Sequence, residues 1–238
     1  MTAASKYAQR RSRDVSDSHE DFLDLAGHEL RTPITALRGQ AQLLQRRLRT
    51  QPDRASDAET VDKMMYQIER LNSELDVYLD AAHIFRGNFE LLPLECDLVP
   101  IARKLVDIYA AGISTHIIRL ETQEEEIVGV WDRKRLHMAL AALLSNAVKF
   151  SGNSDVVIRL EVAHPSVRVE IHDAGVGIPP GERYRIFEPY AHGSNVAHGG
   201  AGLGLFVTRA IVKRHHGRIG VRARPGGGSI FWVTLPLA

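Results

Sequence analysis

The sequence of 238 residues contains one cysteine, Cys96, and therefore cannot form an internal disulfide. This excludes the small disulfide-stabilised class of secreted proteins and favours a reducing compartment, so we expect a cytoplasmic location. The sequence also lacks a long hydrophobic run, because its most apolar stretch, residues 138–144, is far shorter than the roughly 20 residues of a membrane-spanning helix. No signal peptide is expected.

An excess of charge of one sign is missing as well. The 30 Lys and Arg residues are balanced by 29 Asp and Glu residues, which gives a formal net charge of +1. Nothing in this balance favours binding to nucleic acid through bulk charge. The remaining composition, with 44% hydrophobic and 25% charged residues, is typical of a globular protein of one or two domains. Residues 1–15 carry several basic side chains and are predicted to form a linker or tail.

Two segments carry apolar residues at the three- and four-residue spacing of helices that pack along one stripe. Helices are expected at about residues 16–48 and 57–85, with Pro52 in the turn between them. A single helical hairpin would bury only a narrow seam. We therefore predict that residues 16–86 pair with a second copy of the chain as a homodimer with a four-helix bundle.

The periodicity changes after Gly87, a common type of helix stop. Strands are expected at residues 117–120, 156–162, 167–171, 219–221 and 230–235, and helices at residues 98–109, 133–149 and 203–215. Mixed strands and helices predict an α/β sandwich, in which one helical layer covers one face of a sheet, over residues 92–238. The predicted fold class is α+β, with the helical hairpin followed by this sandwich.

His28 lies in the first predicted helix, within the sequence GHELRTP. The apolar stripe points away from it, so its imidazole is expected at the surface, where the unprotonated ring is a nucleophile near neutral pH. Glu29 could accept the proton of one ring nitrogen, and Thr32 lies one helical turn further on the same face. The other ten histidines, with His83 and His116 among them, are interpreted as ordinary surface residues.

Three further motifs lie in the second half of the chain. Near the end of an apolar helix, Asn146 offers an oxygen for Mg²⁺ and Lys149 a positive charge for a phosphate. Asp173 begins the sequence DAGVGIP directly after a strand, where a carboxylate can accept a hydrogen bond from an amine such as that of adenine. The glycine-rich residues 199–204 open the last helix, whose free N–H groups can bind an anion. Residues 190–201 before this helix could form a mobile lid.

A dinucleotide-binding turn is the competing interpretation of DAGVGIP. It requires a third glycine and a long helix, but Pro179 takes the place of that glycine and only a short helix is expected, at residues 182–186. The sequence therefore disfavours this interpretation.

Together and in order, these motifs resemble the conserved boxes of bacterial two-component sensor histidine kinases. GHELRTP resembles the H box, LLSNAVKF the N box, DAGVGIP the first glycine box, RIFEPY the F box and GAGLGL the second glycine box. The resemblance extends over about residues 16–238. It implies a dimerisation and histidine-phosphotransfer domain at residues 16–86 and a GHKL-type catalytic ATP-binding domain at residues 92–238.

The resemblance also implies an activity. ATP would phosphorylate His28 with Glu29 as the base, and the phosphoryl group would pass to an aspartate in the receiver domain of a response regulator. Thr32 would orient a water in a phosphatase reaction. Asp173 would contact adenine, Asn146 would bind Mg²⁺ and Lys149 would contact a phosphate. The other implied ATP contacts are Phe150, Gly175, Gly177, Ile178, His192, Gly200, Gly202, Leu203 and Gly204.

Two positions depart from the family pattern. Ala142 stands where the N box usually has a second Asn, and His192 stands where Arg or Lys is common. Ala142 supports an alternative function, a non-catalytic dimeric scaffold that binds nucleotide and docks a response regulator. Another ATPase of the superfamily, such as a chaperone, mismatch-repair protein or topoisomerase, is disfavoured by the histidine in a helical hairpin. We expect no contact of this chain with nucleic acid or membrane, although it could be the cytoplasmic part of a larger, membrane-attached sensor.

Overall fold

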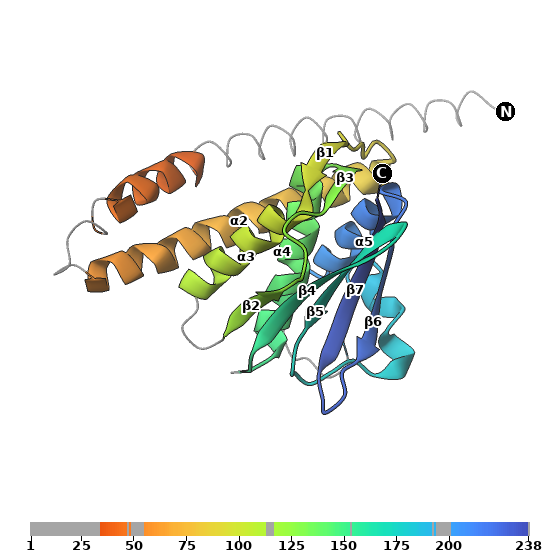
Figure 1. The fold of residues 1–238 in the computed structure, drawn as a ribbon. Helices are drawn as coiled ribbons and strands as arrows, with labels where there is room; N and C mark the ends of the chain where they lie inside the picture. The colour runs from red at the N-terminus through yellow and green to blue at the C-terminus, as the bar shows by residue number, and fades with distance from the viewer. Residues whose placement is uncertain are drawn as a thin grey trace, which may run out of the picture.

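The computed structural model describes residues 34–46, 48, 55–112, 117–152, 154–191, 193 and 201–237. Residues 34–46 are helical and lie beside α2 (Ala55–Arg86) as the two arms of a hairpin (Figure 1). Gln45 donates a hydrogen bond to Asp62, and Arg38 forms an ion pair of 3.5 Å with Glu69. Seven residues backwards along the first helix, from 45 to 38, thus correspond to seven residues forwards along α2, from 62 to 69. The two helices are therefore antiparallel, which confirms the helical hairpin.

A five-stranded mixed sheet forms the centre of the second part of the chain. Its strand order is β2-β4-β5-β7-β6, with β2 and β4 parallel and all other neighbours antiparallel. The helices α3, α4 and α5 lie along one face of this sheet (Figure 1). The bounds are β2 (Ile118–Glu121), β4 (Val156–Ala163), β5 (Ser166–His172), β6 (Arg218–Ala223), β7 (Ser229–Pro236), α3 (Leu98–Gly112), α4 (Arg133–Phe150) and α5 (Gly204–Arg214).

The core lies between the sheet and the helices. Strand residues that alternate along β4 and β5, such as Ile158 and Ile171, are fully buried against Leu144 of α4 and Ile211 of α5. The alternation leaves the other face of each strand partly exposed, as expected for a sheet covered on one side. The predicted α+β class, a hairpin followed by an α/β sandwich, is therefore confirmed.

Two expectations need correction. A second, two-stranded sheet of β1 (Leu94–Asp97) and β3 (Val128–Trp131) was not predicted, because four-residue strands carry too little alternation to be recognised. The short helix expected at residues 182–186 is replaced by two separate 3₁₀ turns, η2 (Pro180–Glu182) and η3 (Arg185–Phe187). Gly181 disfavours a continuous α-helix there, and Ile186 and Phe187 are buried as anchors.

The expectation that all remaining histidines lie at the surface is wrong for His215, which is 4% exposed. Its Nε2 accepts a hydrogen bond of 2.8 Å from the backbone N–H of Asp132, and its Nδ1 lies 2.9 Å from the carbonyl of Ile211. Burial lowers the pKa of this imidazole, and the neutral ring ties the start of α4 to the end of α5. His83, His137 and His172 are also partly buried, and His116 lies outside the described residues.

α2 packs against the helical layer of the second part, mainly along α3. Asp80 of α2 forms a buried ion pair with Arg135 of α4, and Asp76 forms a more exposed ion pair of 3.4 Å with Lys134. The chain leaves α2 at Arg86 and enters β1 at Leu94, although the domain boundary at residues 86–92 stays a prediction.

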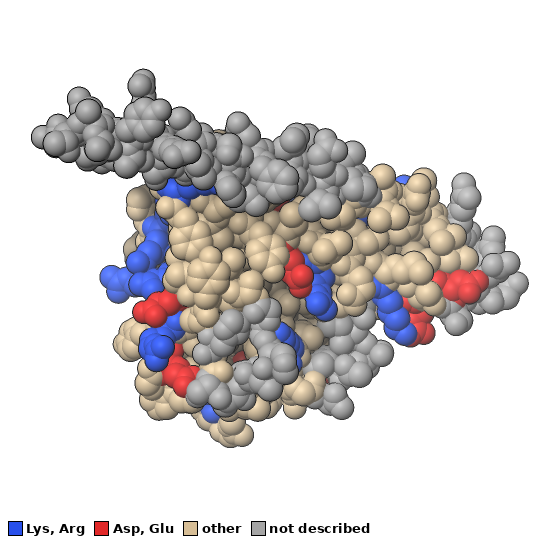
Figure 2. Space-filling view, turned by 180° about the vertical axis from the view of Figure 1, so that it is seen from behind, with Lys and Arg blue, Asp and Glu red and all other residues tan. Residues whose placement is uncertain are grey.

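The surface seen from behind carries Lys and Arg interspersed with Asp and Glu, between larger uncharged areas (Figure 2). Among the helices that the structure describes, none has the length and hydropathy needed to cross a membrane.

Candidate functional site

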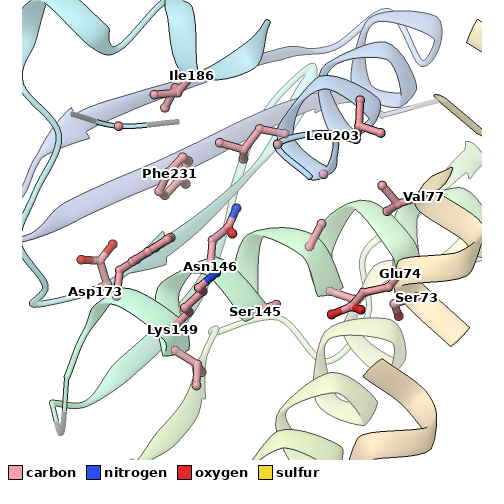
Figure 3. A pocket seen from close by; sticks show the side chains of 18 of the residues that line it. Ser73, Glu74, Val77, Ser145, Asn146, Lys149, Asp173, Ile186, Leu203 and Phe231 are labelled. Atoms are coloured by element: carbon pink, nitrogen blue, oxygen red, sulfur yellow. The ribbon is translucent and has the colours of Figure 1, made fainter. Parts of the chain in front are cut away.

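A cavity of about 640 Å³, here called the main cavity, opens between α4, the loop after β5, the start of α5 and α2. Its volume lies within the range of roughly 300–1,000 Å³ that is usual for small-molecule sites. Figure 3 shows Asp173 at one end of the cavity, Asn146 and Lys149 in the middle, and Ser73, Glu74 and Val77 of α2 at the other end. The cavity thus receives side chains from both parts of the chain.

Asp173 lies at the end of β5 and is only 3% exposed. Its Oδ1 accepts hydrogen bonds from the backbone N–H groups of Gly175 at 2.9 Å and Ser229 at 3.1 Å. Burial raises the pKa of this carboxyl group, while the two backbone donors oppose the rise. Since Oδ1 is held by the backbone, Oδ2 is the carboxylate atom left to accept a hydrogen bond from a ligand.

Close backbone contacts explain two glycines beside Asp173. A Cβ at Gly175 would lie 2.1 Å from the carbonyl oxygen of Phe150, and a Cβ at Gly228 would lie 2.1 Å from that of Asp173. Gly228 also has a φ of +94°, a conformation that side chains disfavour. These contacts press the loop after β5 against the end of α4, so that Asp173 and the α4 side chains border one cavity.

Asn146 and Lys149 lie one turn apart in the last part of α4, on the side that borders the main cavity. Asp132 caps the start of this helix by accepting a hydrogen bond of 3.0 Å from the N–H of Arg135. Lys149 is exposed, with its Nζ 5.3 Å from the centre of the Phe150 ring. These two residues bring an amide oxygen and a positive charge to the middle of the cavity.

The donor set fits Mg²⁺ only in combination with a phosphate. Among the described residues, no group of three His, Cys, Asp or Glu side chains is arranged to hold a metal ion. Mg²⁺ commonly takes one or two protein oxygens and completes its octahedron with waters and substrate phosphates. Asn146 is suited to be such a protein ligand.

The start of α5 forms the opposite wall. Gly202 has a φ of +67°, and a Cβ there would lie 2.8 Å from the backbone of Tyr190. The N–H of Tyr190 donates a hydrogen bond of 3.0 Å to the carbonyl of Gly202, which joins the two ends of the intervening loop. Leu203 at the helix start provides no side-chain cap, so the first N–H groups of α5 are available for an anion.

The α2 wall of the main cavity was not foreseen from the sequence. Six α2 residues border the cavity, and the Nε of Arg70 donates a hydrogen bond of 3.1 Å to Glu74 across one helical turn. No sequence motif could reveal this wall, because it depends on how α2 packs against a segment about 70 residues away. The α2 residues are Tyr66, Arg70, Ser73, Glu74, Val77 and Tyr78.

The structure brings nine predicted ligand contacts to this one cavity. A tenth, Gly175, does not border the cavity but hydrogen-bonds to Asp173. His28, Glu29, Thr32, His192 and Gly200 lie outside the described residues. The nine are Asn146, Lys149, Phe150, Asp173, Gly177, Ile178, Gly202, Leu203 and Gly204.

Two family models match the chain. Residues 131–238 match the "Histidine kinase-, DNA gyrase B-, and HSP90-like ATPase" family, and residues 18–84 match the "His Kinase A (phospho-acceptor) domain". The first match contains the main cavity apart from its α2 and α3 walls, and the second contains His28.

Curated relatives match nearly the whole chain. The autoinducer 2 sensor kinase/phosphatase LuxQ of Vibrio harveyi is 31% identical over 98% of the chain, and the sensor protein KdpD of Escherichia coli is 32% identical over 99%. The chain spans only 28% and 26% of these two proteins.

Solved structures show the same architecture. Full-length ShkA in complex with AMPPNP superposes with a TM-score of 0.64 and 25% identity, over 92% of this chain and 46% of ShkA. The histidine kinase ThkA, which was solved in complex with the response regulator protein TrrA, superposes with a TM-score of 0.57 and 26% identity. The match covers 100% of this chain and 68% of the ThkA chain.

Proposed function

We propose that this chain, which belongs to the two-component sensor histidine kinases, phosphorylates itself on His28 with ATP and passes the phosphoryl group to an aspartate of a response regulator. The observation that carries the proposal is the convergence of Asp173, Asn146, Lys149 and the glycines before α5 on one cavity. Relatives of this family include proteins named as sensor kinases, and a structural relative was solved with a response regulator protein.

ATP is proposed to lie along the main cavity with its adenine at Asp173. The carboxylate accepts a hydrogen bond from the exocyclic amine of adenine, and the buried position of Asp173 excludes competing water. The triphosphate then runs past Lys149 towards the uncapped start of α5, where the positive charge and the free N–H groups compensate its negative charge. Asn146 would hold Mg²⁺ together with the phosphate, and the ion would supply positive charge that stabilises the transfer.

The chemical step is an in-line displacement. A ring nitrogen of His28 attacks the γ-phosphorus, the bond to the β–γ bridging oxygen breaks, and ADP leaves. Glu29 holds the proton of the other ring nitrogen, so that the attacking nitrogen keeps its lone pair. Positioning of the two reactants supplies much of the rate, because little covalent chemistry is required of the protein.

The hairpin register supports the placement of His28. Arg38 pairs with Glu69. If the first helix continues as predicted, position 28, ten residues before Arg38, would lie opposite position 79, ten residues after Glu69. Val77 and Tyr78, at this level of α2, border the main cavity. We therefore propose that a histidine at this height faces the γ-phosphate, either in the same chain or in a partner copy.

We also propose that the chain is a homodimer. Several large apolar side chains of the hairpin are about half exposed in the single chain, although they belong to the predicted stripes. A second hairpin would cover them in a four-helix bundle. These side chains are Leu37, Leu44, Met64, Leu71 and Tyr78.

Transfer to a receiver domain and a phosphatase reaction assisted by Thr32 complete the proposal. Both reactions would take place in the cytoplasm, which contains ATP. The scaffold alternative is favoured only by Ala142, which borders the main cavity without a polar group. It predicts nucleotide binding without a phosphohistidine.

The decisive test is incubation of the wild type and His28→Ala with γ-labelled ATP and Mg²⁺. Acid-labile, base-stable label on the wild type alone is the expected result. An Asp173→Asn variant serves as the control for a nucleotide-dependent reaction and should be labelled weakly. Equal labelling of wild type and His28→Ala would overturn the assignment of the site. Nucleotide binding without label on either protein would contradict self-phosphorylation by this chain alone and favour the scaffold or a core that requires a sensor domain.

A further inference from the structure

A second cavity, of about 500 Å³, lies between four helical segments and is separate from the main cavity. Its walls come from residues 34–46, α2, α3 and α4. They therefore belong both to the hairpin and to residues 92–238, here called the ATP-binding part. Of the described residues, only Ser73 borders both cavities, which makes them neighbours across α2. The lining includes Pro100, Ile101 and Met138 as an apolar portion.

The charged side chains around this second cavity are not balanced. Its two carboxylates already have partners, since Glu69 pairs with Arg38 at 3.5 Å and Asp76 with Lys134 at 3.4 Å. Lys104 of α3 and Arg133 of α4 also border the cavity, and neither forms an ion pair with a carboxylate in the described part of the chain. The cavity therefore has an excess of two positive charges from two different helices.

His137 of α4 gives a second, independent indication. Its Nε2 is buried and has no hydrogen-bond partner, the only side-chain nitrogen or oxygen in this state among the described residues. Burial lowers the pKa of the imidazole, and the charges of Lys104, Arg38 and Arg133 lower it further against the opposing effect of Glu69. An anion in the cavity would neutralise the charges of these cations.

We propose that the second cavity binds a small polyanion, a phosphate ester or a polycarboxylate, that bridges the hairpin and the ATP-binding part. Lys104 and Arg133 bind its negative groups, and its charge acts on the neighbouring imidazole of His137. The volume suits a ligand of this size, and the apolar walls suit its carbon portion. Because the site is complete only when α2 lies against α3 and α4, the ligand stabilises this arrangement and opposes movements that separate the two parts.

The test is calorimetric titration of the full chain with pyrophosphate and, separately, with citrate in buffer without Mg²⁺, which both ligands chelate. Binding of at least one ligand with a Kd below 1 mM is expected on the basis of about two charged contacts (roughly 4 kcal/mol at 1 mM). Pyrophosphate alone would identify phosphate esters as the ligand class, and citrate alone polycarboxylates.

Three variants locate the binding. Lys104→Ala with Arg133→Ala should weaken it at least tenfold, whereas Arg103→Ala with Arg218→Ala removes the same charge elsewhere and should leave it unchanged. Lys149→Ala should keep the binding that depends on Lys104 and Arg133, because Lys149 borders only the main cavity. Absence of binding to the wild type, equal weakening by both double variants, or loss in Lys149→Ala alone would each overturn the proposal.

The titration of His137 gives a readout that does not depend on the double variant. Imidazole signals followed by NMR should show a rise in the pKa of His137 when the ligand is added, because the anion reverses the effect of the neighbouring cations. The signal of His83 is the internal control, and addition of the ligand should leave it unchanged. An unchanged pKa of His137 at saturating ligand would also reject the site.

Discussion

Asp80 of α2 and Arg135 of α4 form a buried ion pair that joins the helical hairpin to the ATP-binding part. Asp80 is only 2% exposed, and the guanidinium of Arg135 lies 4.9 Å from the centre of the Phe89 ring. The buried carboxylate loses hydration that the pairing only partly restores. Burial accordingly raises the pKa of Asp80 to about 6, although Arg135 opposes the rise.

This pKa makes the stability of the folded chain dependent on pH. Asp80 binds its proton more tightly in the folded chain than in the unfolded one, where its pKa is 3.8. Its favourable contribution is therefore complete below about pH 4 and is lost as the pH rises through about 6. The difference corresponds to roughly 3 kcal/mol. Denaturation followed by tryptophan fluorescence at pH 4.5 to 7.5 should show this trend.

Asp80→Asn isolates this effect from that of all other titrating groups. The free energy of unfolding of the wild type minus that of Asp80→Asn should increase as the pH falls from 7.5 to 4.5, since the variant has no proton to bind at this position. A difference that stays constant, or that decreases towards low pH, would show that the pKa of Asp80 is not raised in the folded chain.

Asp173→Asn should weaken ATP binding at least tenfold without changing the fold. The amide can still accept the backbone hydrogen bonds at Oδ1, but it presents an NH₂ group where the carboxylate would accept from adenine. Calorimetry with ATP and Mg²⁺ measures the affinity. Asp155→Asn, which changes a carboxylate of the same domain that is 42% exposed, should bind ATP as the wild type does.

Gly175→Ala should lower both stability and ATP affinity. The new Cβ would lie 2.1 Å from the carbonyl oxygen of Phe150, so the loop after β5 must move away from α4. Overpacking of this kind costs about 1–3 kcal/mol, and the movement displaces Asp173. Gly181→Ala is the matched control, because no atom lies within 4 Å of its Cβ position. Equal thermal midpoints for the two variants would show that this contact is not tight.

The sequence predicted the elements with strong periodicity and missed those that depend on tertiary contacts. The stripe from Val61 to Ala82 placed α2 to within two residues, because each apolar position repeats the same helical face. The strand β1 was missed since its partner β3 lies some 30 residues away and both are short. Glycine spacing and the position of Asp173 after a strand predicted ligand contacts that line the main cavity. Arg70 and Glu74 border this cavity only because α2 packs against the rest of the chain.

Ala142→Asn should tighten the binding of ATP in the presence of Mg²⁺ by about threefold to tenfold. Ala142 borders the main cavity one helical turn before Asn146, and an amide there adds an oxygen near the proposed Mg²⁺. The gain should disappear when Mg²⁺ is removed. Ala142→Leu has nearly the same size without the amide and should show no gain, so that equal affinities of the two variants would point to packing instead.

Leu37→Glu combined with Leu71→Glu should convert a dimer into a monomer. These side chains are 55% and 52% exposed in the single chain, and a bundle of two hairpins would bury them, where unpaired carboxylates are costly. Light scattering coupled to size exclusion measures the mass at micromolar concentration. The wild type should give twice the mass of the 26.5 kDa chain, and the variant a single one.

Leu92→Glu combined with Leu94→Glu distinguishes loss of a specific interface from a general effect of added charge. These leucines are even more exposed, at 78% and 73%, but they lie outside the hairpin. Their replacement should leave the dimer intact, because the proposed bundle does not include them. A monomeric wild type would contradict the four-helix bundle directly, and dissociation by this second pair would move the interface from the hairpin to β1.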